Sequence, residues 1–200
     1  MKITETNLTF NGTPKRRSST KRIIIHHSAS GDVSASTIHG WHLGQGWLGI
    51  GYQFVIRAGG TVERGRVEWS IGSHSGPGGN GDSIGICLAG NFETGKPTEA
   101  QLAALVELIQ YLRGKYGDLF VIGHKDVMAT ACPGKHFPWV ELQKRLEERP
   151  MAEDWKRNII SDGMAAGILT EYHEPDQPVT KWFVVALVLN AMKILRGEKK

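Results

Sequence analysis

A continuous apolar run near the amino terminus sets the strongest limit on how this chain can fold. The run places three successive isoleucines between Arg22 and the pair His26 and His27. A strand with one face in water alternates apolar and polar residues, whereas an unbroken apolar run indicates a strand buried on both faces. A second short run, residues 119–122, also reads as a buried strand. We therefore expect a parallel or mixed sheet whose faces are covered.

The rest of the first 148 residues supplies helices and a hairpin. Ala58-Gly59-Gly60 separates two strand-like stretches, which is the pattern of a β-hairpin. Thr98 and Gln101 form a capping box before a long apolar stripe, and such a box marks the start of a helix. The fold class that we predict is α/β, with a central mixed β-sheet flanked by helices. The predicted elements are helices over residues 34–44, 98–117 and 138–148 and a hairpin over residues 51–64.

Residues 151–200 differ in pattern from the chain before them. Charged residues and a proline at positions 147–150 mark the boundary, and two short helices are predicted beyond it. Two short helices cannot bury a full hydrophobic core on their own. We expect a first domain over residues 1–148 and a small helical C-terminal module over residues 151–200. The module would dock on the first domain, pair with a partner or act as a binding module.

Both predicted buried strands end in histidine, and a cysteine lies nearby in the sequence. His124 follows the second strand, and Cys132 lies in the loop after it. Imidazole and thiolate are ligands that zinc prefers. The first strand offers His26 or His27, which alternation sends to opposite faces, and the pattern does not say which one reaches the metal. The hypothesis is a His/His/Cys zinc site with an open fourth position. Cys132 would be used there, so Cys87 is expected to be a core residue and not its disulfide partner.

Other polar and aromatic residues have structural explanations that compete with functional ones. Tyr52 begins the first hairpin strand, where a half-buried aromatic ring with its hydroxyl at the surface is expected. His42 has helical spacing with two apolar residues, so we expect it to be packed and hydrogen-bonded, with His39 exposed. Residues 73–82 form a glycine-dense loop without the spacing of a phosphate-binding loop. Such a loop can admit substrate close to the backbone, or it can be a plain connection.

The balance of charge is mildly basic. The chain has a net charge of +4, and all of the excess lies before residue 151. Such a charge attracts polyanions, either nucleic acid or an acidic cell-wall polymer. The basic run at residues 15–22 can be a nucleic-acid arm, but a solvated lead-in to the first strand is favoured, so nucleic acid is not the expected partner.

No apolar run approaches the roughly 20 residues of a membrane span, and the first residues lack the apolar core of a signal peptide.

Five blocks of sequence occur in the order found in one known family. They are Ile24-Ile25-His26-His27-Ser28-Ala29, Trp41-His42-Leu43-Gly44-Gln45-Gly46-Trp47-Leu48-Gly49-Ile50-Gly51-Tyr52-Gln53-Phe54, Gly59-Gly60-Thr61-Val62-Glu63-Arg64-Gly65-Arg66, Asn80 with Ser83-Ile84-Gly85-Ile86, and Gly123-His124-Lys125-Asp126-Val127 with Ala131-Cys132-Pro133-Gly134. Over roughly residues 20–145 the chain resembles the zinc-dependent N-acetylmuramoyl-L-alanine amidases, a family that includes phage lysozyme-type amidases and peptidoglycan-recognition proteins. Five ordered blocks are a far more specific signal than one short motif.

The resemblance implies roles for individual residues. It implies that His26, His124 and Cys132 are the zinc ligands, because the family uses the first histidine after the apolar run. It implies that Tyr52 is a catalytic tyrosine beside the metal-bound water. Thr130 occupies a position where phage relatives often carry a catalytic lysine and other active members carry threonine. Threonine provides no cation, so any oxyanion stabilisation by Thr130 would be a neutral hydrogen bond.

The resemblance also implies a substrate and a reaction. His74 and Asn80 match a region that lines a groove, so they are expected to contact substrate. The expected activity is zinc-dependent hydrolysis of the amide bond between N-acetylmuramic acid and L-alanine in peptidoglycan, as an endolysin or autolysin. One alternative is a peptidoglycan-binding module without catalysis, and another is a phage-type amidase that also regulates a polymerase. The complete ligand set argues for catalysis.

Two further expectations concern where the protein acts. We expect it to be made in the cytoplasm and to act on the cell wall after phage-type release or alternative export. Residues 151–200 faintly resemble cell-surface S-layer-homology modules, in Gly167-Ile168-Leu169 and in Pro178-Val179-Thr180 before a helix. Those modules usually come in sets, and this chain has at most one. The resemblance implies binding to a secondary cell-wall polymer, with simple docking as the alternative.

Overall fold

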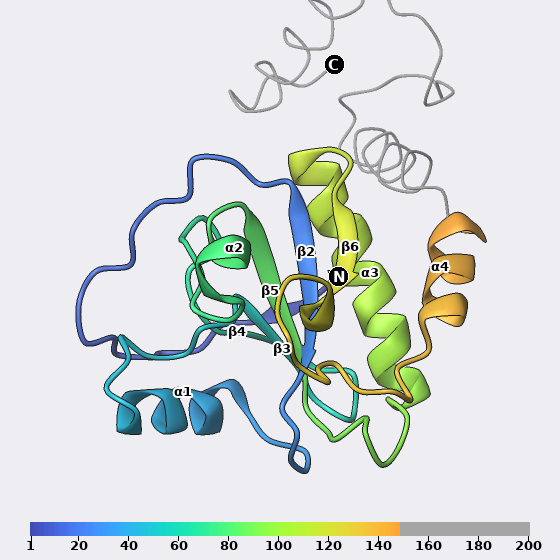
Figure 1. Ribbon diagram of the computed structural model, residues 1–200, viewed down its shortest axis with the longest axis horizontal. Coiled ribbons are helices and arrows are strands. Elements are labelled where there is room, and N and C mark those ends of the chain that lie inside the picture. The colour runs from blue at the N-terminus through green and yellow to red at the C-terminus, as the bar shows by residue number, and fades with distance from the viewer. Residues whose placement is uncertain (149–200) are drawn as a thin grey trace, which may run out of the picture. The chain divides into compact units, whose positions relative to one another are not determined.

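Six strands form one mixed sheet in the order β1-β4-β3-β5-β2-β6 (Figure 1). The computed structural model describes residues 1–148, so the helical module expected at residues 151–200 lies outside the described part of the chain. The sheet and its helices confirm the α/β fold class predicted from the sequence. The elements are β1 (Ile3–Thr4), β2 (Arg22–His27), α1 (Ala35–Gly44), β3 (Phe54–Ile56), β4 (Val62–Arg64), α2 (Gly76–Asn80), β5 (Ser83–Leu88), α3 (Glu99–Tyr116), β6 (Phe120–Gly123), the short 3-10 helix η1 (His124–Asp126) and α4 (Trp139–Glu148).

The strand with the isoleucine run lies inside the sheet, as its composition predicts. β2 pairs in parallel with β5 on one side and with β6 on the other. Ile23, Ile24 and Ile25 are all fully buried. β6 departs from the expected burial because it is an edge strand, and Phe120 at its start is 73% exposed. The prediction of a second strand is therefore right, but its full burial is wrong. Leu119 is buried, whereas Phe120 is exposed and Val121 and Ile122 are only partly buried.

Helices cover both faces of the sheet, which makes a three-layer arrangement. α3 and α4 share one core cluster with Ile23 and Ile25 of β2 (Figure 1). α3 starts at the predicted capping box. On the opposite face, Ala35 of α1 packs in a second cluster with Val55 and Cys87. Of the helices in residues 1–148, none has the length and apolar character needed to cross a membrane.

The buried face of α1 differs from the predicted one. Ala35, Ile38 and His39 are its buried residues, whereas Trp41 is 44% exposed. His39 is only 6% exposed, and its Nδ1 accepts a hydrogen bond of 3.1 Å from the N–H of Ile50. The segment after the helix folds back over His39 and supplies this partner. The prediction of an exposed His39 is therefore wrong.

The basic run at residues 15–22 is built into the fold. Arg17 is 7% exposed, and its Nη1 donates to the carbonyl oxygen of Ser70 at 2.7 Å. The guanidinium of Arg16 lies 4.7 Å from the ring centroid of Trp69, and Arg16 also forms a β-bridge with Ser70. The run is therefore neither a free nucleic-acid arm nor a fully solvated approach to β2. Arg16 and Arg17 contact the segment that contains Trp69 and Ser70.

Candidate active site

β2 and β6 run in parallel and end at the same edge of the sheet, which brings their terminal histidines together. Ile25 of β2 is paired with Gly123 of β6, so the next residues, His26 and His124, lie side by side. The centroids of their rings are 4.5 Å apart. The turn after β6 is fixed by Asp126, whose Oδ2 accepts from the N–H of Gly123 at 2.7 Å. Sheet register alone therefore accounts for the meeting of two residues that are far apart in the sequence.

The alternation of β2 distinguishes His26 from His27. His26 is paired with Cys87 of β5, and Cys87 belongs to the cluster under α1. His27 points to the opposite face, where its Nδ1 accepts from the N–H of Phe92 at 2.9 Å. Phe92 belongs to the core cluster on the α3 side. Of the two adjacent histidines, only His26 is on the side of the sheet where His124 lies.

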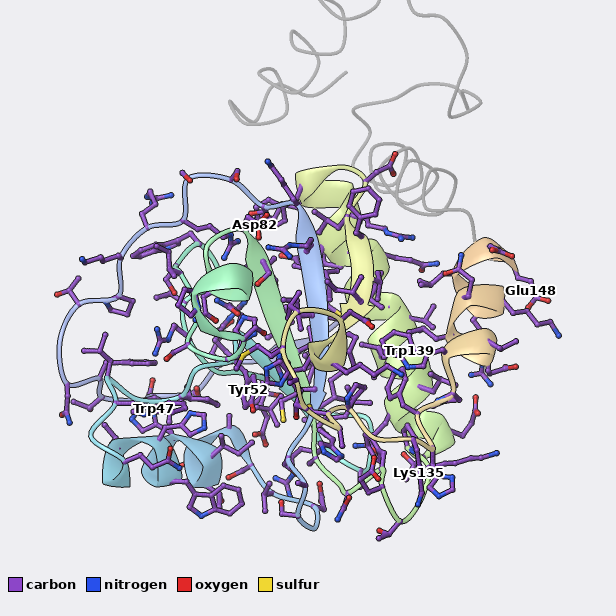
Figure 2. All side chains as sticks on the ribbon, viewed as in Figure 1. Trp47, Tyr52, Asp82, Lys135, Trp139 and Glu148 are labelled. Carbon is purple, nitrogen blue, oxygen red and sulfur yellow. The ribbon has the colours of Figure 1, made fainter. Side chains whose placement is uncertain are left out.

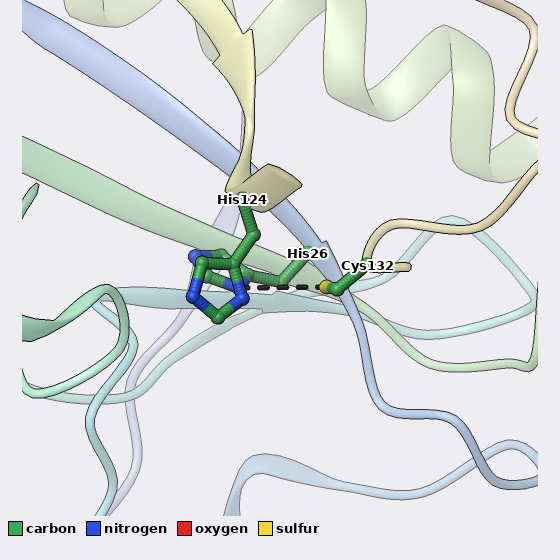
Figure 3. A group of neighbouring side chains, drawn as sticks. All are labelled: His26, His124 and Cys132. Atoms are coloured by element: carbon green, nitrogen blue, oxygen red, sulfur yellow. Dashed lines mark hydrogen bonds between the residues drawn. The ribbon is translucent and has the colours of Figure 1, made fainter. Parts of the chain in front are cut away.

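Cys132 brings a thiol to the same place. Its loop is tied back by the N–H of Lys125, which donates to the carbonyl oxygen of Cys132 at 2.9 Å. The Sγ atom of Cys132 accepts from the N–H of His27 at 3.4 Å and lies 3.6 Å from Nδ1 of His26 (Figure 3). One possible ligand atom from each of His26, His124 and Cys132 lies within 4.8 Å of the other two. The structure therefore brings together the three residues expected to bind metal.

The chemistry of this trio fits a zinc-like cation. Burial, together with the neighbouring histidines, lowers the pKa of His26 well below its ordinary value, so the imidazole stays in the neutral form that binds metal. Burial raises the pKa of the Cys132 thiol to about 11, so its thiolate requires a nearby cation. Two nitrogens and one sulfur from the protein match the three-ligand set of a catalytic zinc site. Cys132 and Cys87 are both free, and Cys87 is fully buried in the core as expected.

Tyr52, which Figure 2 labels, lies two residues before β3 and packs against the core cluster that contains Ala35 of α1. Its ring centroid is 5.0 Å from that of His26. Burial raises the pKa of the Tyr52 hydroxyl well above its ordinary value, so this group is a phenol and not a phenolate at neutral pH. His42 is half-buried and accepts from the N–H of Gly51 at 3.0 Å, and its ring packs at a tilt against that of Trp47 with the ring centroids 4.5 Å apart. His42 is thus hydrogen-bonded, as expected.

His74 and Asn80 are both turned toward protein groups. His74 is 8% exposed, and its Nδ1 lies 3.0 Å from Nε2 of His26. The Oδ1 atom of Asn80 accepts from the backbone N–H groups of His74 and Ser75, each at 2.8 Å. The glycine-dense loop that contains them includes α2, a short helix that the sequence pattern did not predict. Ser75 was not predicted as a site residue either, and its only sequence signal is its place next to His74.

Two exposed residues of the loop after β6 also lie close to the trio. Thr130 accepts at Oγ1 from the N–H of Cys132 at 3.2 Å, which leaves the hydroxyl hydrogen available as a donor. Met128 is 46% exposed, and its Sδ lies 3.3 Å from Nε2 of His124. Sequence reasoning singled out Thr130 and missed Met128. A methionine in a loop carries no sequence signal for such a contact, because only the fold of the loop creates it.

The sheet and the three convergent side chains define the class of the protein: an α/β domain with a candidate metal site at one edge of its sheet. The sequence profile of the N-acetylmuramoyl-L-alanine amidases matches residues 16–135, which is more than half of the chain. The chain belongs to the N-acetylmuramoyl-L-alanine amidase family.

Relatives from phages, insects and bacteria are similar to this chain. The endolysin of Escherichia phage T7 is 42% identical over 127 residues, which cover 60% of this chain and 83% of the endolysin. Peptidoglycan-recognition protein SC2 of Drosophila melanogaster is 33% identical over 132 residues, which cover 60% of this chain and 71% of that protein. Among solved structures, the N-acetylmuramoyl-L-alanine amidase LysC from Clostridium intestinale URNW superimposes with a TM-score of 0.71 at 37% identity, covering 74% of this chain and 98% of LysC.

The family defines the reaction. This protein is an N-acetylmuramoyl-L-alanine amidase, which hydrolyses the amide bond between N-acetylmuramic acid and L-alanine in peptidoglycan. The expected hydrolysis of this amide bond and the expected kinship with phage endolysins and peptidoglycan-recognition proteins are both confirmed. The matched segment, residues 16–135, contains His26, His124 and Cys132.

Proposed function

We propose that this amidase is a zinc hydrolase in which His26, His124 and Cys132 hold the metal. The observation that carries the proposal is the convergence of one donor atom from each residue within 4.8 Å at the edge of the sheet. Two neutral imidazoles and one thiolate match the ligands that zinc prefers and leave a position open. When bound, zinc would lower the pKa of water to about 7 and polarise a carbonyl group.

Tyr52 is the proposed hydrogen-bond donor to the reacting amide. Its hydroxyl keeps its proton because burial raises its pKa, and its ring stands 5.0 Å from that of His26. A phenol in this position can donate to the oxygen that gains negative charge as the amide carbon becomes tetrahedral. The raised pKa also makes Tyr52 a poor general base near neutral pH. Its proposed role is therefore the stabilisation of charge.

Thr130 is the proposed second donor, and it is a neutral one. Its Oγ1 already accepts from the backbone of Cys132, so the hydroxyl hydrogen can point outward toward substrate. Hydrogen bonds from neutral groups are weaker than those from charged groups, by roughly a factor of two. We therefore assign Thr130 a smaller share of oxyanion stabilisation than a lysine at the same place would provide.

The products released from purified cell walls test the reaction. Hydrolysis of the proposed bond creates new amino-terminal alanine and leaves the glycan chains intact. We expect new alanine amino termini to accumulate with time, without new reducing sugar ends. New reducing ends in place of alanine would identify a glycosidase. Binding to walls without either product would favour the peptidoglycan-binding module without catalysis.

The two cysteines provide a matched test of the metal site. We expect Cys132→Ala to lose bound zinc and wall hydrolysis, because it removes the only sulfur ligand of the proposed set. Cys87→Ala removes the other thiol, which is fully buried in the core, and should keep both properties. Zinc content is measured on each purified protein by elemental analysis. A Cys132→Ala protein that retains one zinc and normal hydrolysis would exclude the proposed ligand set.

The proposed place of action is the cell wall, reached by phage-type release or alternative export. The similarity to phage endolysins supports this proposal.

We also propose that residues 151–200 form a separate module that binds a secondary cell-wall polymer. Deletion of residues 149–200 should then reduce the amount of protein that pellets with purified walls while the remaining domain still hydrolyses them. Equal pelleting with and without these residues would exclude wall binding by the module.

A further inference from the structure

The two ring nitrogens of His26 face different partners. Nδ1 lies 3.6 Å from the Sγ of Cys132, whereas Nε2 lies 3.0 Å from Nδ1 of His74 and 3.3 Å from Oγ of Ser75. A neutral imidazole carries one proton, and the nitrogen that binds a metal must be the other one. A metal bound through Nδ1 therefore requires the proton on Nε2, which is the side where His74 and Ser75 lie.

The ring of His74 occupies a space that two glycines leave for it. A Cβ atom added at Gly72 would lie 2.3 Å from Cδ2 of His74, and one added at Gly85 would lie 2.5 Å from the same atom. Gly85 stands inside the fully buried strand β5, where a glycine weakens the strand and marks a close approach. Asn80 fixes the backbone of His74 through its Oδ1. The ring therefore has little freedom to leave His26.

Packing alone does not explain a histidine at this position. The Nε2 atom of His74 is buried and has no hydrogen-bond partner among residues 1–148. A buried polar nitrogen without a partner is costly, and an apolar side chain of similar size would avoid that cost. The contact of His74 with a candidate metal ligand supplies a reason for the residue. Ser75, whose Oγ lies 2.7 Å from Nδ1 of His74, completes the group.

We propose that His74 is a positioning residue for the metal site. Its Nδ1, together with the hydroxyl of Ser75, accepts the Nε2–H of His26, which leaves Nδ1 of His26 unprotonated and aimed toward Cys132. Outer partners of this kind fix the tautomer and the orientation of a metal-binding histidine. In this assignment His74 acts through His26 and does not contact substrate. The inference rests on the zinc function proposed above.

Two variants of His74 separate the hydrogen bond from the packing. Asparagine can place a side-chain oxygen near the position of the histidine Nδ1, whereas leucine has a similar shape and no acceptor. Zinc affinity is measured by competition with a chromophoric chelator, and unfolding of the metal-free proteins is measured in parallel. We expect His74→Leu to bind zinc about 10- to 100-fold more weakly than the native protein and His74→Asn to recover most of that loss.

The possible results distinguish a failure of the proposed role of His74 from a failure of the proposed zinc binding. A native protein that binds no zinc would overturn both. If the native protein binds zinc and His74→Leu binds it within about twofold as tightly, only the role of His74 is overturned. Equal losses in His74→Asn and His74→Leu would also overturn it, because the acceptor would then be irrelevant.

A measurement on the native protein covers the case in which His74→Leu does not fold. Nitrogen-15 NMR of the histidine side chains reports which ring nitrogen carries the proton. In the zinc-loaded protein we expect the proton of His26 on Nε2, with a signal that changes in Ser75→Ala. A proton on Nδ1 of His26 would overturn the assignment.

Discussion

Burial acts in opposite directions on the candidate ligands. It lowers the pKa values of His26 and His124, so both imidazoles are neutral and ready to bind a cation near pH 7. It raises the pKa of Cys132 to about 11, which disfavours the thiolate that zinc requires. Zinc uptake must therefore displace the thiol proton of Cys132. It follows that the affinity of this site for zinc should increase as the pH rises toward the pKa of the thiol.

Tyr52 offers the sharpest test of a single residue. Tyr52→Phe removes one hydroxyl next to His26 and keeps the ring, so zinc should remain bound. The rate of hydrolysis should fall by about 100- to 1,000-fold, which is typical for the loss of one oxyanion donor. Turnover is measured on a soluble peptidoglycan fragment, together with zinc content. Tyr111→Phe, at a 42% exposed position of α3, is the matched control and should match the native rate. A Tyr52→Phe enzyme as fast as that control would remove Tyr52 from the mechanism.

At the scale of elements, the strands that carry the site could be predicted because their composition is distinctive. The isoleucine run predicts β2, and the short apolar run predicts β6, which His124 follows directly. The register between these strands could not be predicted, because pairing depends on contacts between distant residues. That register decides that His26 lies beside His124. The contact between His74 and His26 was out of reach for the same reason.

The errors of prediction also have physical causes. In α1 the spacing i, i+3, i+4 fits Ala35, Ile38 and His39 as well as a stripe that contains Trp41. The hydrophobicity of Trp41 favoured the wrong stripe, and the correct one depends on the segment that folds back at Ile50. β1, of two residues, and α2, of five, are too short for a periodic pattern.

Gly85 in β5 tests the packing around the site at this scale. In Gly85→Ala the new methyl group would lie 2.5 Å from Cδ2 of His74, so the ring or the strand must move. We expect a loss of about 1–3 kcal/mol in the free energy of unfolding of the metal-free protein, as for other overpacked cores, and weaker zinc binding. Gly114→Ala is the control, because a Cβ there meets nothing within 4 Å on α3. That substitution should stabilise by about 0.5–1 kcal/mol. A neutral Gly85→Ala would show that the His74 ring can shift freely.

At the scale of the whole described domain, Glu68 connects segments that are far apart in the chain. Its carboxylate accepts from Arg64 at 3.1 Å, from Lys115 at 2.7 Å and from the hydroxyl of Tyr116 at 2.6 Å. Lys115 and Tyr116 lie at the end of α3, whereas Arg64 ends β4. The guanidinium of Arg17 lies 6.0 Å from the ring centroid of Tyr116. Glu68 thus ties the hairpin to the end of α3, where Arg17 of the basic run packs on Tyr116.

The charge of Glu68 should make stability depend on pH in a defined direction. Burial by itself would raise the pKa of Glu68, but the hydrogen bonds from Lys115 and Tyr116 and the charges of Lys115 and Arg64 outweigh it, so the pKa is lowered. A carboxyl whose pKa is lower in the folded than in the unfolded state stabilises the fold above its unfolded value, about 4.3. That contribution disappears as the pH falls through the folded value. At a pH below both the folded and the unfolded pKa of Glu68, the carboxyl is protonated in both states and contributes no stability through its charge.

The native protein and Glu68→Gln should therefore differ most near neutral pH. We expect Glu68→Gln to lower the free energy of unfolding by about 1–3 kcal/mol at about pH 7, the range for hydrogen bonds to charged groups. The difference should shrink as the pH falls below about 4.3. Urea unfolding with a chelator present measures both proteins, and the titration of His26 and His74 cancels because both retain these residues. Glu147→Gln, an exposed control on α4, should stay within about 0.5 kcal/mol of native throughout. A difference that stays constant as the pH falls would show that Glu68 contributes by shape and not by charge.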